Sequence, residues 1–462
     1  MERVKTLLKN SVIFAIGNFG SRLILLVLVP FYTYYLSTTQ YGTVDLITTT
    51  VSMLTPIVTL SIYEGTLRFV MDKDADNKIA ILENSFILSI ISILIFYSIG
   101  FLVYYFYKKI IFDYFGYLSI ILILQSFQLI LAQYSRGIGK IKVYAINGII
   151  NSLVLAISNV FLIIFYGMGI HGYFCSIIIS NAISLIFLIF TNFYDIKNFN
   201  KQMISLDIVV KMLKYSVPLI PNSFMWWLMN ASSRYFILFF LGSSENGIFA
   251  VASKIPSIIT MFQTIFFQAW QLSAIEEFDS SDTEIFYSNI FVFFSNFMIL
   301  STSIIFIFLE PVLSFLLSNE YVDTWKYVPG LLLGVVFSSF SSFYGTIYVA
   351  SKKTNAIFST TVIGGLLSVL FNFLLIPSIG LNGAGFSMAL SFGVIWLIRV
   401  VDSKKIMNIR IYTKELVCQF VLLAIQLCLL YWSSWYFSII PFILISIISI
   451  MGFKKRISLF NN

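Results

Sequence analysis

The sequence predicts an all-α polytopic membrane protein of about 14 transmembrane helices. Of its 462 residues, 59% are hydrophobic and only 11% are charged, and the mean hydropathy is +0.92. A soluble domain usually carries about 25% charged residues. Apolar runs of about 20 residues, which cross ~30 Å of hydrocarbon as helices, recur along the whole chain. They leave no stretch long enough for a water-soluble domain.

Fourteen apolar stretches qualify as membrane-spanning helices. Most are separated by polar connections, whereas only a turn at Ser433 and Ser434 separates the last two. The expected spans are 11–36, 42–70, 84–107, 112–135, 141–166, 171–194, 215–241, 246–272, 285–309, 325–350, 354–377, 381–401, 412–432 and 434–452.

The distribution of lysine and arginine orients these spans, because cytoplasmic loops of membrane proteins carry an excess of both residues. With the N-terminus in the cytoplasm, 23 of the 29 lysines and arginines fall in or beside cytoplasmic segments. The outside loops hold only Lys108, Lys109 and Lys326. We therefore expect both termini to be cytoplasmic. This orientation accounts for the net charge of +8 without a nucleic acid partner.

The chain also repeats itself. A shift of 205 residues aligns the first span with the seventh, and a shift of 213 residues aligns Asn159 with Asn372. Each repeat contains six spans, so both have the same orientation, and such parallel repeats favour a substrate site between two lobes. The predicted domains are an N-lobe at 1–210 (spans 1–6), a C-lobe at 211–408 (spans 7–12) and an additional C-terminal helix pair at 409–462 (spans 13–14).

Three cations lie inside predicted spans, namely Arg22, Arg234 and Lys254. An ionised side chain at the bilayer centre costs about 2.5–3.5 kcal/mol, and such residues usually face a bundle interior or a wet cavity. Asp45 is the only deep acidic residue, and one carboxylate cannot neutralise three cations. We therefore predict that the three cations line a cavity that binds an anion.

Polar side chains accompany these cations at helical spacing in spans 1, 2, 7 and 8. The cavity-lining candidates are Asn18, Thr49, Ser52, Asn222, Trp226, Asn230, Ser257 and Gln268. The alternative is that the hydroxyl and amide side chains join neighbouring membrane helices by hydrogen bonds. Pro218 and Pro221 predict a bent seventh span, because proline frees backbone carbonyls and kinks a helix.

No motif predicts catalysis, a cofactor or a metal site. The three cysteines, Cys175, Cys418 and Cys428, lie inside apolar runs, and the last two are about 15 Å apart along one helix. The single histidine, His171, sits in an outside turn. The segment "GIGK" at 137–140 lacks the spacing of a phosphate-binding loop. We expect a protein that is not an enzyme and that needs neither cofactor nor metal.

The segments "YSVPLIPNSF" and "SSRYFILFFLGSSENGIFAVASKIPSII" around spans 7 and 8, with "YGTVDLITTT" in span 2, carry a family resemblance. The chain resembles the Wzx-type oligosaccharide flippases, the polysaccharide transporter branch of the multidrug/oligosaccharidyl-lipid/polysaccharide flippase superfamily. That family often has an acid before the span 7 arginine, where this chain has Ser233. The resemblance implies two six-helix lobes around a central cavity, two added C-terminal helices and alternating access.

The resemblance also implies a substrate and a pathway. The substrate would be an undecaprenyl-pyrophosphate-type lipid-linked glycan, a repeat unit of O-antigen (lipopolysaccharide) or another surface polysaccharide, turned from the cytoplasmic to the outer leaflet. The protein would reside in the bacterial cytoplasmic (inner) membrane and work with the polymerase and chain-length proteins of the same pathway. Arg22, Arg234 and Lys254 would hold the pyrophosphate.

Two other functions stay open. A related multidrug or cation antiporter would share the fold and would need deep acids, whereas the cavity candidates here are mostly basic. We hypothesise that Asp45 binds a proton or cation during transport; the alternative is that it is a counter-ion for a neighbouring base. A membrane glycosyltransferase or polymerase is the enzyme alternative. The segment "DKD" at 72–74 resembles a metal–nucleotide motif, but it lies in a short connection that we interpret as solvated.

The predicted orientation can be tested by cysteine labelling. In a variant without native cysteines, a cysteine at Thr39 should react with an impermeant thiol reagent added outside intact cells, whereas one at Lys404 should not. The reverse labelling pattern would show that the helices are inserted in the opposite sense.

Overall fold

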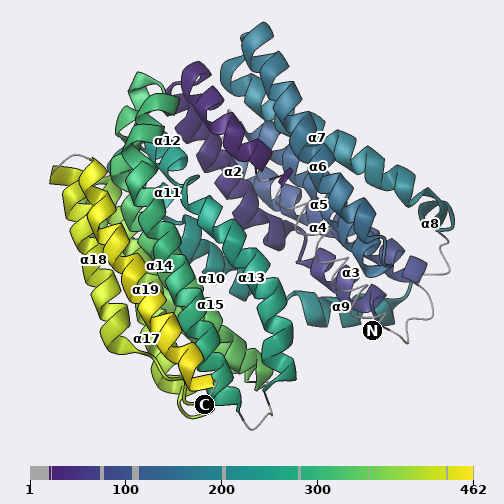
Figure 1. The fold of residues 1–462 in the computed structure, drawn as a ribbon. Helices are drawn as coiled ribbons and strands as arrows, with labels where there is room; N and C mark the ends of the chain where they lie inside the picture. The colour runs from purple at the N-terminus through teal and green to yellow at the C-terminus, as the bar shows by residue number, and fades with distance from the viewer. Residues whose placement is uncertain are drawn as a thin grey trace. The chain divides into compact units, whose positions relative to one another are not determined.

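The regular structure is helical, and no strand occurs among the described residues (Figure 1). The computed structural model describes residues 20–21, 23–72, 78–106, 114–199, 204–278, 282–351, 353–432 and 435–460. Ten helices in this part of the chain are long and apolar enough to cross a membrane, or twelve if each of two sharply bent helix pairs is one span. The prediction of an all-α polytopic membrane protein is therefore confirmed.

The two remaining predicted spans occur as shorter pieces. The described part of the first span is the apolar helix Leu23–Tyr35. The seventh span is divided into α9 (Leu206–Ser216), α10 (Leu219–Ala231) and α11 (Ser233–Phe240). Neither span contains 18 residues of described continuous helix, so both fall outside the ten long helices.

The helices form two compact units. One comprises the residues up to Leu36 with Thr43–Trp227, and the other comprises Ser37–Gly42 with Leu228–Asn462. The other helices before α9 are α2 (Thr38–Val58), α3 (Ile62–Val70), α4 (Lys78–Phe106), α5 (Phe115–Gly137), α6 (Ile141–Asn159), α7 (Gly169–Thr191) and α8 (Phe193–Lys197). Those after α11 are α12 (Ser243–Ala252), α13 (Pro256–Glu276), α14 (Thr283–Leu316), α15 (Val328–Ala350), α16 (Thr354–Ile379), α17 (Leu381–Ser403), α18 (Thr413–Trp432) and α19 (Ile439–Phe460).

A polar cluster joins three helices inside the first unit. Gln128 on α5 donates from Nε2 to the Ser184 hydroxyl on α7 at 2.5 Å. That hydroxyl donates to Asn147 Oδ1 on α6 at 2.6 Å. Interhelical hydrogen bonds of this kind fix the packing of membrane helices, where apolar surface alone gives little direction.

The second unit has a counterpart of this cluster, centred on Arg399 of α17. The guanidinium donates from Nε to Thr360 Oγ1 at 3.0 Å and from Nη2 to Thr361 Oγ1 at 3.3 Å, both on α16. It also donates from Nη1 to the Ser341 carbonyl on α15 at 2.8 Å. The 213-residue shift that aligns Asn159 with Asn372 also places Gln128 on Ser341 and Asn147 on Thr360.

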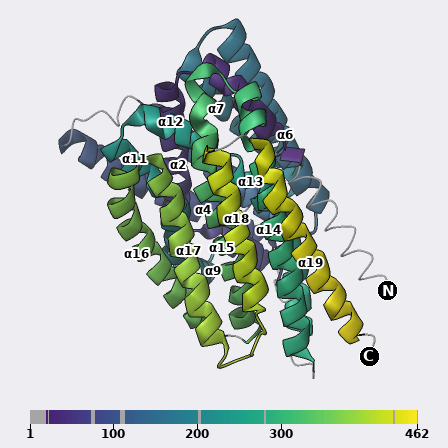
Figure 2. The same cartoon turned by 60° about the vertical axis from the view of Figure 1, so that its left-hand side comes forward.

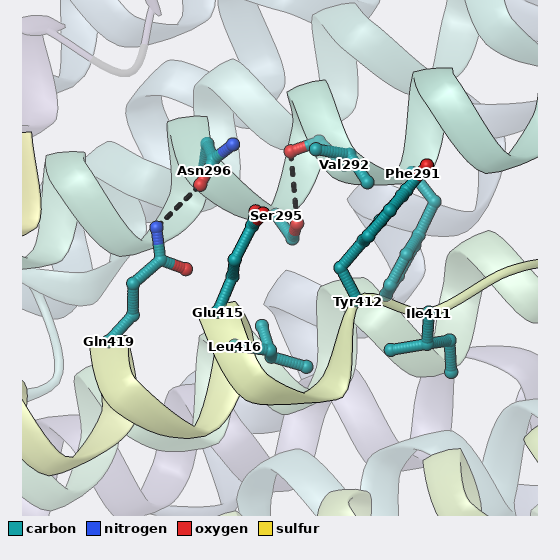
Figure 3. Close-up of a pocket in the computed structure, with 9 residues that line it drawn as sticks. All are labelled: Phe291, Val292, Ser295, Asn296, Ile411, Tyr412, Glu415, Leu416 and Gln419. Atoms are coloured by element: carbon teal, nitrogen blue, oxygen red, sulfur yellow. Dashed lines mark hydrogen bonds between the residues drawn. The ribbon is translucent and has the colours of Figure 1, made fainter. Parts of the chain in front are cut away.

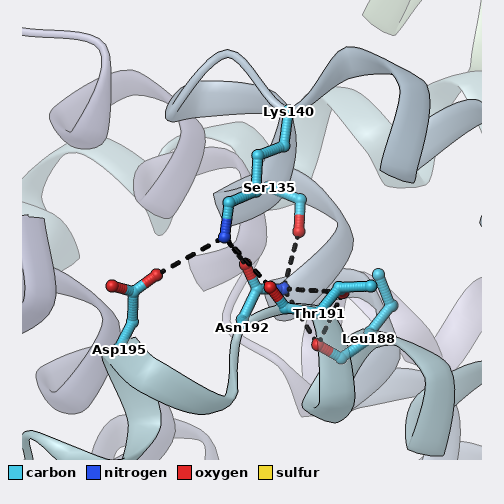
Figure 4. Close-up of polar contacts among 6 residues, drawn as sticks. All are labelled: Ser135, Lys140, Leu188, Thr191, Asn192 and Asp195. Atoms are coloured by element: carbon cyan, nitrogen blue, oxygen red, sulfur yellow. Dashed lines mark hydrogen bonds and ion pairs between the residues drawn. The ribbon is translucent and has the colours of Figure 1, made fainter.

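The turn between α5 and α6 is fixed to the end of α7 (Figure 4). Lys140 Nζ donates to the Thr191 carbonyl at 3.0 Å and to Asn192 Oδ1 at 3.2 Å, and it lies 3.8 Å from an Asp195 carboxylate oxygen. Asn192 Nδ2 donates to Ser135 Oγ at 2.8 Å. A cation and an amide thus satisfy polar groups at a helix C-terminus, where positive charge is favourable.

The last two helices, α18 and α19, pack against α14 in the second unit (Figure 2). Gln419 Nε2 donates to Asn296 Oδ1 at 2.6 Å and to Ser449 Oγ at 3.0 Å, beside a pocket between α14 and α18 (Figure 3). Two turns further along both helices, Ser303 Oγ donates to Gln426 Oε1 at 2.6 Å. Two glutamines at a seven-residue spacing therefore attach α18 to α14.

A break with an unusual backbone separates α2 from α3, which meet at 56°. Leu60 and Ser61 have positive φ angles of 49° and 51°. Side chains other than glycine seldom adopt this conformation, which stores about 1–3 kcal/mol per residue. Pro56 lies in the preceding turn, and Ser92 Oγ on α4 donates to the Val58 carbonyl at 2.6 Å.

The first turns of α2 and α12 touch through two glycines. A Cβ atom added to Gly247 would lie 1.9 Å from the Thr38 carbonyl oxygen, and one added to Gly42 would lie 2.0 Å from the Ser243 carbonyl oxygen. Asn246 Nδ2 donates to the Gly42 carbonyl at 2.8 Å. The two glycines are 205 residues apart, so the contact joins equivalent segments of the repeat.

We predict that Gly247→Ala lowers the thermal unfolding temperature of the purified protein sharply, because its methyl group and the Thr38 carbonyl oxygen cannot occupy the same space. The matched control is Gly116→Ala in the first turn of α5, where a Cβ meets nothing within 4 Å. Alanine favours a helix by about 0.8–1.0 kcal/mol over glycine, so the control should unfold at the wild-type temperature or above. Equal unfolding temperatures for the two variants would contradict the contact.

Candidate functional site

Arg234 lies in the first turn of α11 and is half-buried. Its guanidinium donates from Nη1 to the Asn230 carbonyl at 3.3 Å and from Nη2 to Ser253 Oγ at 3.2 Å. The ring of Phe249 lies under the guanidinium, 5.6 Å from Cζ to the ring centroid. A cation over an aromatic face gains about 0.5–2 kcal/mol.

The helix is interrupted just before Arg234. Ser232 separates α10 from α11, and its hydroxyl donates to the Leu228 carbonyl at 2.5 Å. Two side chains of α16 support the break: Ser368 Oγ donates to the same carbonyl at 3.2 Å, and Asn372 Nδ2 donates to Ser232 Oγ at 3.2 Å. Hydrocarbon offers no partner to a freed carbonyl, so these bonds make the break tolerable.

A second interruption lies where the prolines predicted a bend. α9 ends at Ser216, and α10 begins at Leu219, after Pro218. Proline lacks a backbone N–H and clashes with the preceding turn, which explains the break there. Pro221 lies in the first turn of α10, where a missing N–H costs nothing.

Lys254 lies in the break between α12 and α13, two helices bent by 46°. It is half-buried and directly follows Ser253, the residue that accepts a hydrogen bond from Arg234. Ser257 is exposed one turn later and donates to the Lys254 carbonyl at 2.5 Å. Asn230, which presents its carbonyl to Arg234, is also exposed. The structure thus brings Arg234 and the Lys254 segment together.

The candidates on α2 and the first part of α10 belong to the first unit. Thr49 is buried and Ser52 exposed on α2, whereas Asn222 and Trp226 are half-buried on α10. Trp227 Nε1 donates to the Thr49 carbonyl at 3.2 Å. This bond holds α10 against α2 at the level of the predicted polar face.

Asp45 is almost fully buried, with 5% of its surface exposed. Its carboxylate lies near enough to Tyr173 of α7 for the charge to act on the Tyr173 hydroxyl. The rings of Tyr32 and Tyr173 meet edge to face at 5.0 Å, and Asn159 Nδ2 donates to the Tyr32 hydroxyl at 3.0 Å. Asp45 therefore belongs to a polar cluster inside the first unit.

Three predicted site residues lie outside what the structure describes. They are Arg22 and Asn18 of the first span, and the side chain of Gln268 on α13. The joint placement of Arg22, Arg234 and Lys254 around one cavity therefore stays a prediction.

Arg399 is a buried cation that sequence reasoning missed as a site feature. The sequence counts it among the cytoplasmic charges at the end of a span, whereas the structure buries it to 2% exposure. Each of its three nitrogen atoms donates to a neutral oxygen of α15 or α16. The sequence did contain a signal of its burial, because Arg399 lies two residues inside the predicted span 381–401. Because each of its three nitrogen atoms is bonded to a neighbouring helix, Arg399 is suited to joining helices.

Among the described residues, no group of three or more histidine, cysteine, aspartate or glutamate side chains could hold a metal ion. The contacts of Arg234 given above are with an aromatic ring and two neutral oxygen atoms.

A family model described as "Polysaccharide biosynthesis protein" matches residues 7–271. No curated protein matches the chain. Among solved structures, the lipid II flippase MurJ in an inward closed conformation is similar, with a TM-score of 0.68, 17% identity, and coverage of 96% of this chain and 99% of that chain. A MATE protein in complex with MaL6 gives a TM-score of 0.58 at 12% identity, covering 86% and 95%. A MOP superfamily transporter from Pyrococcus furiosus gives a TM-score of 0.56 at 12% identity, and the match covers 86% of this chain and 95% of that chain. At these identities the likeness shows a shared fold.

We predict that Arg399→Met lowers the amount of folded protein in the membrane, because it leaves the Ser341 carbonyl without its arginine donor and removes the link among α15, α16 and α17. Arg399→Lys should restore part of that amount, since the ammonium keeps the charge but presents its N–H groups from one nitrogen atom in place of three. The measurement is fluorescence-detected gel filtration of solubilised membranes. Full recovery of folded protein with methionine would show that the buried charge does not stabilise the fold.

Proposed function

Because the chain belongs to the polysaccharide biosynthesis protein family, we propose that it is a flippase for lipid-linked glycans. Its motifs resemble those of the Wzx-type flippases, which supports a more specific proposal. The substrate is a polyprenyl-pyrophosphate-linked oligosaccharide repeat unit of O-antigen or another surface polysaccharide. The protein moves it from the cytoplasmic to the outer leaflet by alternating access between two lobes.

The observation that carries this proposal is the setting of Arg234. A half-buried guanidinium lies at the break of an apolar span, and its hydrogen bonds to the Asn230 carbonyl and the Ser253 hydroxyl go to neutral oxygen atoms. Lys254 follows directly in the chain. Arginine offers a planar fork that matches phosphate oxygens, and lysine adds a point charge. The proposed anion site comprises both residues and Arg22.

The energetics of the substrate explain why a protein is needed. A hydroxyl group taken into hydrocarbon without a hydrogen bond costs roughly 2–7 kcal/mol, and an isolated charge costs far more. A repeat unit carries many hydroxyls and a pyrophosphate. A polar, cationic passage removes most of this cost while the polyprenyl chain stays in the bilayer.

A multidrug or cation antiporter is the second candidate, since MATE proteins share the fold. Buried Asp45 is the feature that favours it, because an antiporter needs a group that binds and releases a cation. The two functions are compatible if Asp45 couples glycan transport to an ion gradient. The enzyme alternative has less support, because the family and the similar solved structures are transporters or flippases.

The proposed setting is the bacterial cytoplasmic membrane, with both termini in the cytoplasm. The proposed partners are the lipid-linked glycan, membrane lipid, and the polymerase and chain-length proteins that would use the flipped repeat unit.

We predict that Arg234→Ala and Arg22→Ala each reduce surface glycan display by roughly 10- to 100-fold, because a hydrogen bond to a charged group contributes about 1.5–3 kcal/mol. Arg234→Lys and Arg22→Lys should retain part of the display, since the charge stays and the fork is lost. Display is measured by surface staining of a strain that depends on this chain, with the membrane level of each variant quantified in parallel.

The matched control is Arg68→Ala, which removes an exposed arginine at the end of α3 whose ion pair with Asp72 spans 4.0 Å. It should display normal amounts of glycan. Normal display by well-inserted Arg234→Ala protein would refute the anion site, and loss of protein with either replacement would indicate a structural role instead.

The coupling hypothesis predicts that Asp45→Asn abolishes stimulation of flipping by an imposed proton or sodium gradient in proteoliposomes. The reason is that the neutral asparagine side chain cannot bind and release the coupling ion as a carboxylate does. Flipping down the substrate's own gradient should continue. A variant that still responds to the ion gradient would remove Asp45 from the coupling step.

A further inference from the structure

Two hydrogen bonds of Arg234 end where a helix is interrupted. Nη1 reaches back to the Asn230 carbonyl, one residue before α10 ends at Ala231. Nη2 reaches Ser253, the residue that follows the last residue of α12. One side chain therefore connects two helix breaks, at Ser232 and Ser253, that lie 21 residues apart in the chain.

At the first break, Arg234 donates a hydrogen bond to a backbone carbonyl at the C-terminal end of α10. The last carbonyls of a helix have no partner within it. Ser232 and Ser368 donate to the Leu228 carbonyl, and Arg234 donates to the Asn230 carbonyl. The guanidinium is thus one of the groups that stabilise the break between α10 and α11.

At the second break, Arg234 acts on the C-terminal end of α12. Ser253 Oγ donates to the Ala250 carbonyl at 2.8 Å while it accepts from the guanidinium. A cation near a helix C-terminus is favoured by the helix dipole. Phe249, on the last turn of α12, supplies the ring under the guanidinium. Arg234 therefore also holds the end of α12, where the chain bends by 46° into α13.

These contacts are weaker than those that a diphosphate would offer. Both are long, at 3.3 and 3.2 Å, and both acceptors are neutral. Charge-assisted bonds from arginine to phosphate oxygen are shorter, about 2.7–2.9 Å, and roughly twice as strong as bonds between neutral groups. Nη1 and Nη2, which make these bonds, are also atoms that a forked contact to phosphate oxygens uses. We therefore expect a diphosphate to compete with Asn230 and Ser253 for the guanidinium.

We propose that the diphosphate headgroup binds Arg234 and thereby removes its hydrogen bonds from the two helix breaks. In the empty protein, the guanidinium holds the end of α10 and the end of α12. In the loaded protein, it binds the diphosphate, and both breaks lose a hydrogen bond. Ser253 is then a positioning residue that competes with the substrate. The inference rests on the proposed function, and it links binding of the headgroup to movement of spans 7 and 8.

Amide hydrogen exchange of the full chain in lipid nanodiscs tests this proposal, with undecaprenyl diphosphate as the probe. The diphosphate should raise exchange at least threefold in segments 230–235 and 252–257. Undecaprenol, which has the same tail and no phosphate, should leave both segments unchanged. Unchanged or slower exchange in both segments on diphosphate binding would overturn the proposal.

Ser253→Ala gives a second test, because it removes the competing acceptor. Exchange in segment 252–257 should be raised before any lipid is added, and the diphosphate should bind several-fold more tightly than to wild type. The matched control is Ser351→Ala. The Ser351 hydroxyl makes the same bond to a carbonyl three residues earlier, at Tyr348, and accepts no bond from an arginine within the described part of the chain. Weaker diphosphate binding by Ser253→Ala would contradict the competition.

Arg234→Gln separates failure of this inference from failure of the proposed function. If Arg234→Gln binds the diphosphate as tightly as wild type, the proposed anion site is wrong. If it binds at least tenfold more weakly while the wild-type breaks do not respond to the diphosphate, the anion site stands and only the release of the breaks is refuted.

Discussion

Wherever a membrane helix is interrupted, side chains must donate hydrogen bonds to the freed backbone carbonyls. The rest of this structure depends on that constraint. Hydrocarbon supplies no hydrogen bond to a freed carbonyl, so every break within a span needs a donor from the protein. Ser92 serves the break after α2, Ser368 the break after α10, and Ser253 the end of α12. Arg234 reaches two of these places with one guanidinium, which explains how a full charge is accommodated inside an apolar span.

The two units meet the same packing requirement with different chemistry. In the first, Gln128 and Asn147 meet Ser184, and in the second, Ser341 and Thr360 meet Arg399. The positions on the two pairs of helices correspond through the 213-residue shift, although the residue types do not. The equivalent positions in the two units therefore both join three helices, although their residue types differ. Any donor and acceptor of suitable reach can make such a connection.

The helical content, the apolar membrane-spanning character of most helices and the break at Pro218 could be predicted from the sequence, because each depends on local composition. The breaks at Ser232 and Ser253 could not, since their donors come from distant residues such as Asn372 and Arg234. Arg399 was missed for the same reason: its acceptors on α15 and α16 lie far away in the chain. The residue types of the site, with cations beside amides and hydroxyls, were visible, but their joint placement depends on tertiary packing.

The central claim is that Arg234 holds the diphosphate of a lipid-linked glycan. The most direct measurement is a cryo-electron microscopy structure of the full chain in nanodiscs with undecaprenyl diphosphate. We expect phosphate density within hydrogen-bonding distance of the Arg234 guanidinium and a Ser253 hydroxyl that no longer contacts it. Phosphate density elsewhere, with Arg234 still bonded to Ser253 and Asn230, would refute this role of Arg234.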